Sequence, residues 1–556
     1  MQGRALLAHL RAIVGRGHVI TAPSATRAFT NGYRTGSGTV LAVVRPGSLV
    51  EMWHCARACV TAGCIIIVQA ANTGLTGGST PAGGYDRPVV LISTLRIDGI
   101  IPILDGQEAI CLAGATLTML EDRLAPYGRV PHSVIGSTCL GASVVGGICN
   151  NSGGALVSRG PAFTRHALYA RVDENGRLEL VNRLGVLLPD DPEAALALLD
   201  GGTIPPDLVA RTDRADGCSA YEHEVRDIDR PTPARFNADS RRHFGASGSA
   251  GKVVVFAVRT ETFPAARQTE TILLATNDPN DFAAVRRHIL GGFQHLPTTA
   301  EYMHRNAATL AASHGNDICL AVQYLGARRM PFLLAMKLAA DRVLRRFGSA
   351  LTDRLFQAVG RLAPHPLPAA LRRIVDGHEH LLLLSVADDG IAEARRRLSR
   401  DRGKSIAIHT CTAKEAAALQ RLRFATAGAT IRFAAVERAA GALIAIDCAL
   451  PRNRANWQIA LPDDLARQVL ARADYGHFLC HVFHLDFILR PGSDAAAFEA
   501  ALLALLSAEG IMCPAEHSFG HHYPAPENVV AFYRALDPTN TLNPGIGQTS
   551  RGKNWT

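Results

Sequence analysis

No pair of cysteines in this sequence has the Cys-x-x-Cys spacing, although the chain contains 12 cysteines. Their scattered positions give no pattern of a zinc finger and no disulfide framework. Buried thiols in a reducing cytosol fit this usage best.

Long apolar runs are missing as well. No stretch approaches the roughly 18 consecutive apolar residues of a membrane-spanning helix. The first 20 residues carry Arg4, Arg11 and Arg16 and lack the apolar core of a secretory signal. We therefore expect a protein without a spanning helix and without such a signal.

The chain nevertheless has enough apolar residues for several hydrophobic cores. Of its 556 residues, 47% are apolar and 19% are charged, which excludes disorder as the dominant state. At about 150 residues per domain, the length indicates three or four compact units. Pro264 and the stretch from Pro364 to Pro368 mark candidate boundaries.

Positive charge is concentrated in one region. The net charge is +9, and residues 328–373 contain ten basic side chains against only Asp341 and Asp353. Apolar residues alternate with these cations, as in basic amphipathic segments that bind anionic lipid. A solvated helical face is the alternative, and no nucleic-acid-binding motif accompanies the charge. We predict peripheral attachment to an anionic phospholipid surface and no nucleic-acid partner.

The first quarter of the chain alternates strand and helix signals. Residues 39–44 form a short β-type run, and Ser48 with Glu51 forms a capping box for a helix that ends near Gly63. Residues 64–68 are mostly β-branched and predict a buried strand. Further strands are expected at residues 88–93 and 109–113.

Two glycine-rich segments follow these strand signals. The first, residues 70–79, comes directly after the buried strand, and the second runs from His132 to Gly154. Small side chains allow backbone N–H groups to approach a pyrophosphate. The second segment does not match the GxGxxG pattern of a nicotinamide-binding unit, and it indicates backbone lying along an extended ligand.

Residues 69–81 resemble the pyrophosphate loop of FAD enzymes of the vanillyl-alcohol oxidase / p-cresol methylhydroxylase (PCMH) superfamily, and within it the bacterial quinone-dependent D-lactate dehydrogenases. Supporting segments extend over almost the whole chain: residues 131–154, 159–162, 232–237, 300–305, 475–478, 514–517 and 537–547. The resemblance implies an α+β fold with a PCMH-type FAD-binding domain of two α+β subdomains, an α+β cap domain and a helical, basic, membrane-associated insert.

The implied domains are discontinuous in sequence. Residues 1–265 and 514–556 would form the FAD-binding domain, and residues 266–315 and 378–513 the substrate-capping domain. Residues 316–377 would form the basic membrane-associated insert.

The resemblance also implies which residues hold FAD. They are Ala70, Ala71, Asn72, Thr73, Gly74, Gly78 and Ser79 around the pyrophosphate, with Gly136, Ser143, Gly153 and Val255 along the remaining length. The first loop has no His or Cys that could tether the flavin, which favours non-covalent FAD. Cys139 and Cys149 in the second segment leave that point open.

Oxidation of a 2-hydroxy acid needs a base for the hydroxyl proton and a cation for the carboxylate. His517 lies in a segment that resembles the Glu-His-x-x-Gly sequence placing such a base beside the flavin in related dehydrogenases. The alternative is a structural role, since the chain has 21 histidines. Arg423 aligns best with the substrate-binding arginine of the family, and Arg432 is the reserve; a guanidinium binds a carboxylate at two points.

His477, His484 and Glu516 match the metal ligands of related metal-dependent D-2-hydroxyglutarate dehydrogenases. A straight helix would separate the two histidines by about 10.5 Å along its axis, and a straight strand would place them on opposite faces. Only a bent or bulged segment brings both to one divalent ion. The alternative is that both histidines bind the substrate directly.

This resemblance, together with the basic region, implies a peripheral flavoenzyme at the cytoplasmic face of the bacterial inner membrane. It would oxidise D-lactate to pyruvate by hydride transfer to FAD and pass the electrons to a membrane quinone. One alternative is a soluble FAD-dependent dehydrogenase of another D-2-hydroxy acid with a different electron acceptor. Another is a non-enzymatic basic adaptor. The sequence indicates neither the quinone type nor the oligomeric state.

Overall fold

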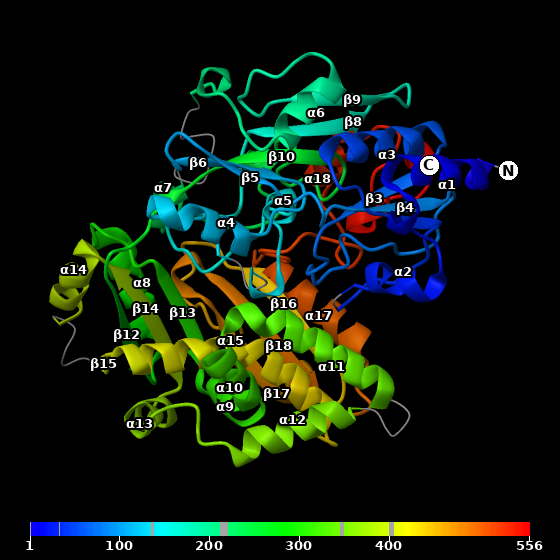
Figure 1. Ribbon diagram of the computed structural model, residues 1–556. Coiled ribbons are helices and arrows are strands. Elements are labelled where there is room, and N and C mark those ends of the chain that lie inside the picture. Colours follow the sequence, from blue (N-terminus) through cyan, green and yellow to red (C-terminus); the bar gives the residue numbers. More distant parts are fainter. Residues whose placement is uncertain (1, 33, 135–137, 212–220, 345–349, 400–404) are drawn as a thin grey trace.

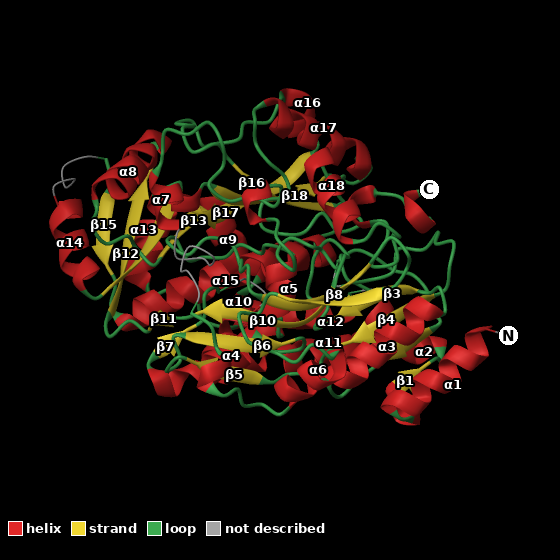
Figure 2. Cartoon of the chain, turned by 90° about the horizontal axis from the view of Figure 1, so that it is seen from above, coloured by secondary structure: helices red, strands yellow, loops and turns green. Residues whose placement is uncertain are grey.

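The computed structural model describes residues 2–32, 34–134, 138–211, 221–344, 350–399 and 405–556 (Figure 1). Two sheets near the N-terminus and one large sheet from the middle of the chain organise these residues. Figure 2 shows the large sheet to one side of the two N-terminal sheets.

The first sheet has the order β1-β2-β4-β3, in which β2, β4 and β3 are parallel. Its strands are β1 (Val19–Ile20), β2 (Ala42–Val44), β3 (Ile65–Gln69) and β4 (Val89–Ser93). Helices α1 (Gln2–Val14), α3 (Leu49–Thr61) and α6 (Pro192–Asp200) share its hydrophobic core, while α2 (Pro23–Thr30) follows β1. The strands predicted at residues 64–68 and 88–93 are therefore confirmed within one residue.

Helix α3 begins where the sequence predicts, with one difference at its cap. The Ser48 hydroxyl accepts a hydrogen bond from Glu51 N at 3.1 Å, but the Glu51 carboxylate accepts from Gly47 N at 2.6 Å rather than from Ser48 N. At the other end, Gly63 has φ +67°, a left-handed conformation that stops the helix at low cost.

The second sheet is antiparallel, with the order β5-β6-β10-β8-β9. Its strands are β5 (Ile100–Ile103), β6 (Glu108–Leu112), β8 (Ala167–Val172), β9 (Leu178–Asn182) and β10 (Val254–Glu261). Helices α4 (Leu117–Leu124) and α5 (Val144–Cys149) pack on it, and the short strands β7 (Arg129–Val130) and β11 (Phe263–Pro264) pair beside it. Helix α7 (Tyr221–Arg226) leads toward the large sheet.

The large sheet has seven antiparallel strands in the order β15-β12-β14-β13-β17-β18-β16. They are β12 (Thr269–Thr276), β13 (Thr299–His304), β14 (His380–Ala387), β15 (Ala407–Thr410), β16 (Leu443–Ala449), β17 (Val469–His477) and β18 (Val482–Leu489). Alternate residues pack on opposite faces. Leu274 and Leu382 join a core with α8 (Pro279–Gly292), α14 (Asp389–Leu398), α16 (Asp463–Ala466) and α17 (Ala495–Ala508). Leu273 and Leu383 join another with α9 (Arg305–His314), α13 (Ala369–Gly377) and α15 (Ala413–Val436).

The basic region is helical, as predicted. It contains α10 (Asn316–Leu325), the short turn η7 (Ala327–Arg329), α11 (Met330–Leu344) and α12 (Leu351–Leu362). Helices α10 and α12 pack on α15, so this region lies one layer outside the large sheet (Figure 1). In the part of the chain that the structure describes, no helix has the length and apolar character needed to cross a membrane.

The C-terminal tail returns to the first sheet. After α18 (Glu527–Leu536), Leu542 forms a parallel bridge with Ile66 of β3. In Figure 1, α18 accordingly lies beside the N-terminal sheets rather than beside the large sheet that precedes it in sequence. The C-terminal tail therefore lies beside β3, the strand that leads into the first glycine-rich segment.

Candidate active site

The cofactor loop, residues 70–79, is an open backbone turn. Among the described residues, no hydrogen-bond acceptor is found for the backbone N–H groups of residues 71–76. Asn72 holds the loop open at φ +54°, since its Nδ2 donates to Asn31 O at 2.9 Å and its Oδ1 accepts from the Ser79 hydroxyl at 3.1 Å. A Cβ on Gly74 would meet nothing within 4 Å. A loop with free donors and open space suits a pyrophosphate.

The glycine tract, residues 132–154, is described at 132–134 and 138–154, and it approaches the C-terminal segment at Gly153. Ser143 caps α5 by accepting from Gly146 N at 3.0 Å, and Val255 is buried on β10. Gly153 touches the C-terminal segment so closely that a Cβ on it would overlap the Glu516 carboxylate. Gly136 lies outside the described residues.

A third segment, residues 516–521, closes on the cofactor loop. The Thr76 hydroxyl donates to Ser518 O at 2.9 Å, and His521 N donates to Thr76 O at 3.0 Å. Asn543 Nδ2 donates to both Gly78 O and Ala250 O, each at 2.8 Å. These contacts place the C-terminal segment beside the loop and the tract.

One buried side chain of the glycine tract has no partner. His132 is 1% exposed, and neither of its ring nitrogens has a hydrogen-bond partner among the described residues. Burial, with the nearby Arg159 charge, lowers the pKa of His132 to about 4. Orphaned buried polar groups require an explanation, and a cofactor lying along the tract supplies one. The residues present therefore fit FAD.

The two candidate metal-binding histidines meet across a hairpin. His477 ends β17, the turn η10 (Phe478–Cys480) and His481 at φ +55° reverse the chain, and His484 lies on β18 opposite Tyr475. The imidazole rings are 5.4 Å apart. One ligand atom from each of His477, His484 and Glu516 lies within 4.8 Å of the others. The required bend is thus a complete reversal between neighbouring strands.

The charges around these groups suit a cation. His477 Nδ1 is 2.6 Å from Glu301 Oε1, and its Nε2 is 3.3 Å from Glu516 Oε2. Burial lowers the pKa of His477, but the two carboxylates outweigh it and raise the pKa to about 9. Burial and the neighbouring His477 lower the pKa of His484 to about 3. Two imidazoles and one carboxylate are a common donor set for zinc and similar ions, so these residues fit a divalent metal.

Arg423 faces this group from α15. Its Nη2 is 2.8 Å from Glu301 Oε2, and its guanidinium lies 4.7 Å above the Tyr475 ring. Its buried Nε has no partner in the part of the chain that the structure describes. That nitrogen is a free donor for a substrate carboxylate.

Arg432, further along α15, is not brought to this group. Its guanidinium is held by Asp317 at 3.1 Å and by Asp353 at 3.0 Å, and both carboxylates come from the outer helices α10 and α12.

His517 connects the two halves of the site. The preceding residue, Glu516, belongs to the candidate metal group, and the following residue, Ser518, contacts the cofactor loop. The side chain is half-buried, and none of the hydrogen bonds between described residues involves its imidazole. Such a histidine is available to accept a substrate proton.

Sequence reasoning gave Glu301 no role, although it binds both His477 and Arg423. The register of the antiparallel strands β13 and β17 places Glu301 directly opposite His477. The sequence offered two signals: Glu301 lies in the family-like segment 300–305, and it is an acidic residue between two apolar-type neighbours, Ala300 and Tyr302. A carboxylate on the outer nitrogen of a metal-binding histidine fixes its tautomer.

Gly153→Ala tests the close approach of the glycine tract to the C-terminal segment. We expect a loss of stability of about 1–3 kcal/mol, because the added methyl must displace the Glu516 side chain. Thermal unfolding of the purified protein measures it. Gly291→Ala on α8, where a Cβ meets nothing within 4 Å, is the control. Equal Tm values for the two variants would contradict the packing described here.

Comparison with known proteins identifies these segments. A family model described as FAD binding domain matches residues 40–182, which include the cofactor loop and the glycine tract. A second model, described as D-lactate dehydrogenase, membrane binding, matches residues 271–555. The predicted FAD cofactor is thereby confirmed.

Among solved structures, p-cresol methylhydroxylase with substrate bound resembles this chain with a TM-score of 0.59 at 12% identity, covering 98% of this chain and 97% of that one. This likeness confirms the predicted fold class.

Full-length relatives are also found. The quinone-dependent D-lactate dehydrogenase of Escherichia coli (strain K12) is 46% identical over 559 residues, covering 99% of this chain and 98% of the relative. The protein of the same name from Haemophilus influenzae is 45% identical over 566 residues, covering 100% of both. The chain therefore belongs to the quinone-dependent D-lactate dehydrogenase family.

Proposed function

We propose that this protein oxidises D-lactate to pyruvate and passes the electrons to a membrane quinone, as the names of its relatives indicate. The observation that carries the proposal is the position of His517, between the cofactor loop and the group formed by His477, His484 and Glu516. A base at this point can reach a substrate that is bound next to the flavin.

FAD, when bound, supplies the acceptor for the hydride of the substrate. Its proposed contacts are those predicted from the sequence. The free backbone N–H groups of residues 71–76 are evidence for the contacts around the pyrophosphate. We propose that the FAD is held without a covalent bond.

The side chains of the site have distinct proposed roles. Arg423 binds the substrate carboxylate through its uncommitted Nε, while Glu301 holds the guanidinium in place at 2.8 Å. His517 takes the hydroxyl proton. A divalent ion at His477, His484 and Glu516, when bound, polarises the substrate hydroxyl. If no ion binds there, the two histidines bind the substrate directly.

The proposed domain division agrees with the positions of the strands. The boundary at residue 265 falls between β11 and β12, and Gly315 separates α9 from α10. The boundary at residue 377 coincides with the end of α13. The large sheet would thus belong to the substrate-capping domain, and α10 to α13 to the insert.

We propose that α11 and α12 attach the protein to anionic phospholipid at the cytoplasmic face of the inner membrane. The distribution of polar and apolar residues on α12 is the reverse of that on a helix of a water-soluble protein, which buries its apolar side. It buries Thr352 and Gln357, whereas the residues of its outer stripe are exposed: Leu355 (65%), Val359 (52%) and Leu362 (90%). Phe332 and Met336 on α11 are 65% and 55% exposed. An apolar surface of this kind marks an interaction site.

Leu355→Glu combined with Leu362→Glu tests that surface. Burial of a leucine contributes roughly 1.5–3 kcal/mol, so we expect binding to anionic vesicles to fall by more than about 10-fold. Vesicle co-sedimentation measures it. Leu187→Glu, at a leucine 68% exposed between β9 and α6, is the control. Equal loss in both variants, or none in the double variant, contradicts this docking surface.

Steady-state turnover tests the proposed function as a whole. The purified protein is assayed with a quinone analogue and D-lactate, L-lactate, glycolate, D-malate or D-2-hydroxyglutarate. We expect the highest kcat/KM with D-lactate. Preference for another D-2-hydroxy acid, without quinone reduction, would instead favour a soluble dehydrogenase with a different acceptor.

A further inference from the structure

Arg235 is one of two fully buried arginines among the described residues, and it contacts the candidate metal group. Its Nη1 is 2.9 Å from Glu516 Oε1, with both side chains at most 4% exposed. Because burying charges costs free energy, an ion pair at this depth needs further hydrogen bonds. The surroundings of Arg235 supply them.

The same guanidinium also binds the glycine tract. Nη1 donates to Gly154 O, and Nη2 donates to Leu156 O at 3.0 Å. The Tyr221 ring lies 5.3 Å from the guanidinium carbon. One side chain therefore joins the Glu516 carboxylate to the backbone that lies along the proposed FAD site.

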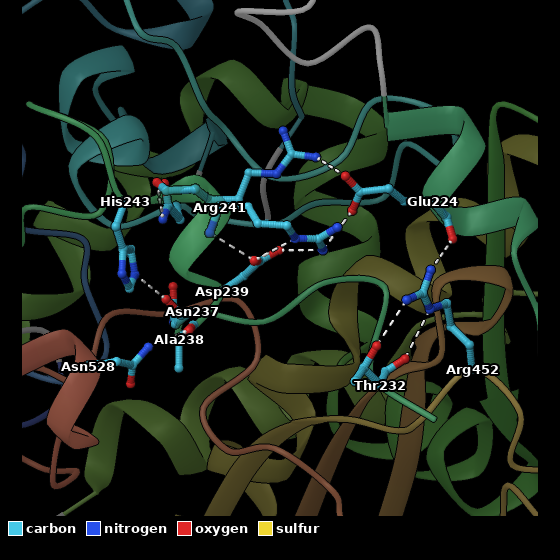
Figure 3. A network of polar contacts seen from close by, with 11 residues as sticks. Glu224, Thr232, Asn237, Ala238, Asp239, Arg241, His243, Arg452 and Asn528 are labelled. Atoms are coloured by element: carbon cyan, nitrogen blue, oxygen red, sulfur yellow. Dashed lines mark hydrogen bonds and ion pairs between the residues drawn. The ribbon is translucent and has the colours of Figure 1, made fainter. Parts of the chain in front are cut away.

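The loop that carries Arg235 is itself fixed (Figure 3). Arg452, which follows β16, donates to Thr232 O and to its hydroxyl, both at 3.0 Å, and also to Glu224 O. Asn528 on α18 donates to Ala238 O at 3.1 Å. The loop is thus tied to the large sheet on one side and to the C-terminal helix on the other.

We propose that Arg235 is a positioning residue for metal binding, a role that rests on the proposed metal at His477, His484 and Glu516. By holding Glu516 Oε1, Arg235 turns Oε2 toward His477, where it lies 3.3 Å from Nε2. It also compensates the negative charge of Glu516 inside the protein. Without this contact the carboxylate has no second anchor and leaves the position that the ion requires.

The test compares Arg235→Gln and Arg235→Lys with the wild type. Chelator-treated holoprotein is titrated with Zn²⁺ or Mn²⁺ alone by calorimetry, and the FAD content is measured in parallel. Loss of an outer-shell partner typically costs 10- to 100-fold in metal affinity, and we expect about that for Arg235→Gln with FAD content unchanged. Arg235→Lys keeps the charge but not the planar fork, and it should recover part of the affinity.

Arg259→Gln is the matched control. Arg259 on β10 is 1% exposed, and it pairs with Glu108 and donates to Gly185 O at 2.9 Å rather than to the candidate metal group or its hairpin. We expect this variant to lose stability but to keep wild-type metal affinity. An equal loss in Arg259→Gln would reduce Arg235 to a structural role.

The titration distinguishes failure of the proposed metal site from failure of the Arg235 role. If the wild type binds no ion, the metal part of the proposed function fails first. If the wild type binds an ion and Arg235→Gln binds it with the same affinity, the positioning role is wrong. Should Arg235→Gln not fold, Arg235→Lys takes its place in this comparison.

Discussion

His517→Gln is expected to lower kcat with D-lactate by about 1,000-fold, within the 10²–10⁴ that a positioned base contributes. Glutamine keeps a polar side chain of similar reach but cannot accept the hydroxyl proton. The flavin should stay bound, because the Thr76 contact to this segment uses the Ser518 carbonyl and not the histidine ring. Steady-state kinetics together with the flavin-to-protein ratio measures both expectations.

His522→Gln is the control for this variant. His522 directly follows that segment, and its Nε2 is paired with Glu499 Oε1 of α17 at 2.7 Å. We expect nearly wild-type kcat. A His517→Gln enzyme with unchanged kcat would remove the proposed base.

Arg423→Leu is expected to raise KM for D-lactate by about 100-fold. Truncating one partner of a buried charge pair costs roughly 2–5 kcal/mol, and about 100-fold corresponds to the lower part of that range. Arg423→Lys should give a KM between those of the wild type and Arg423→Leu, since lysine keeps the positive charge but lacks the Nε donor of the planar guanidinium. Initial rates over a wide range of D-lactate concentration give KM and kcat separately.

Arg432→Leu on the same helix separates a substrate role from a structural one. It leaves Asp317 and Asp353 without their shared cation, so we expect a lower Tm with KM unchanged. A raised KM in Arg432→Leu and an unchanged KM in Arg423→Leu would transfer the substrate role to Arg432.

The local parts of the fold could be predicted from the sequence. The strands β3 and β4, the Ser48 cap and the glycine-rich loop follow from residues close together in the chain. Local spacing did not settle the relation of His477 to His484. A separation of seven residues fits a helix, a strand or a hairpin, and the pairing of β17 with β18 decides among them.

Partners that are distant in sequence were not predictable. Arg235 and Glu516 are 281 residues apart, and Glu301 and His477 are 176 apart. Strand register and loop packing bring them together, and neither leaves a local pattern. In the basic region, composition indicated an amphipathic surface, but only the packing on α15 and α9 shows that α12 turns its polar side inward.

Anaerobic mixing of the purified, FAD-loaded protein with D-lactate tests the central claim most directly. Absorbance in the flavin band reports the arrival of electrons before any quinone takes part. We predict rapid bleaching with D-lactate, none with L-lactate, and bleaching about 1,000-fold slower in His517→Gln. A wild-type flavin that stays oxidised with D-lactate, or a variant that bleaches at the wild-type rate, would contradict it.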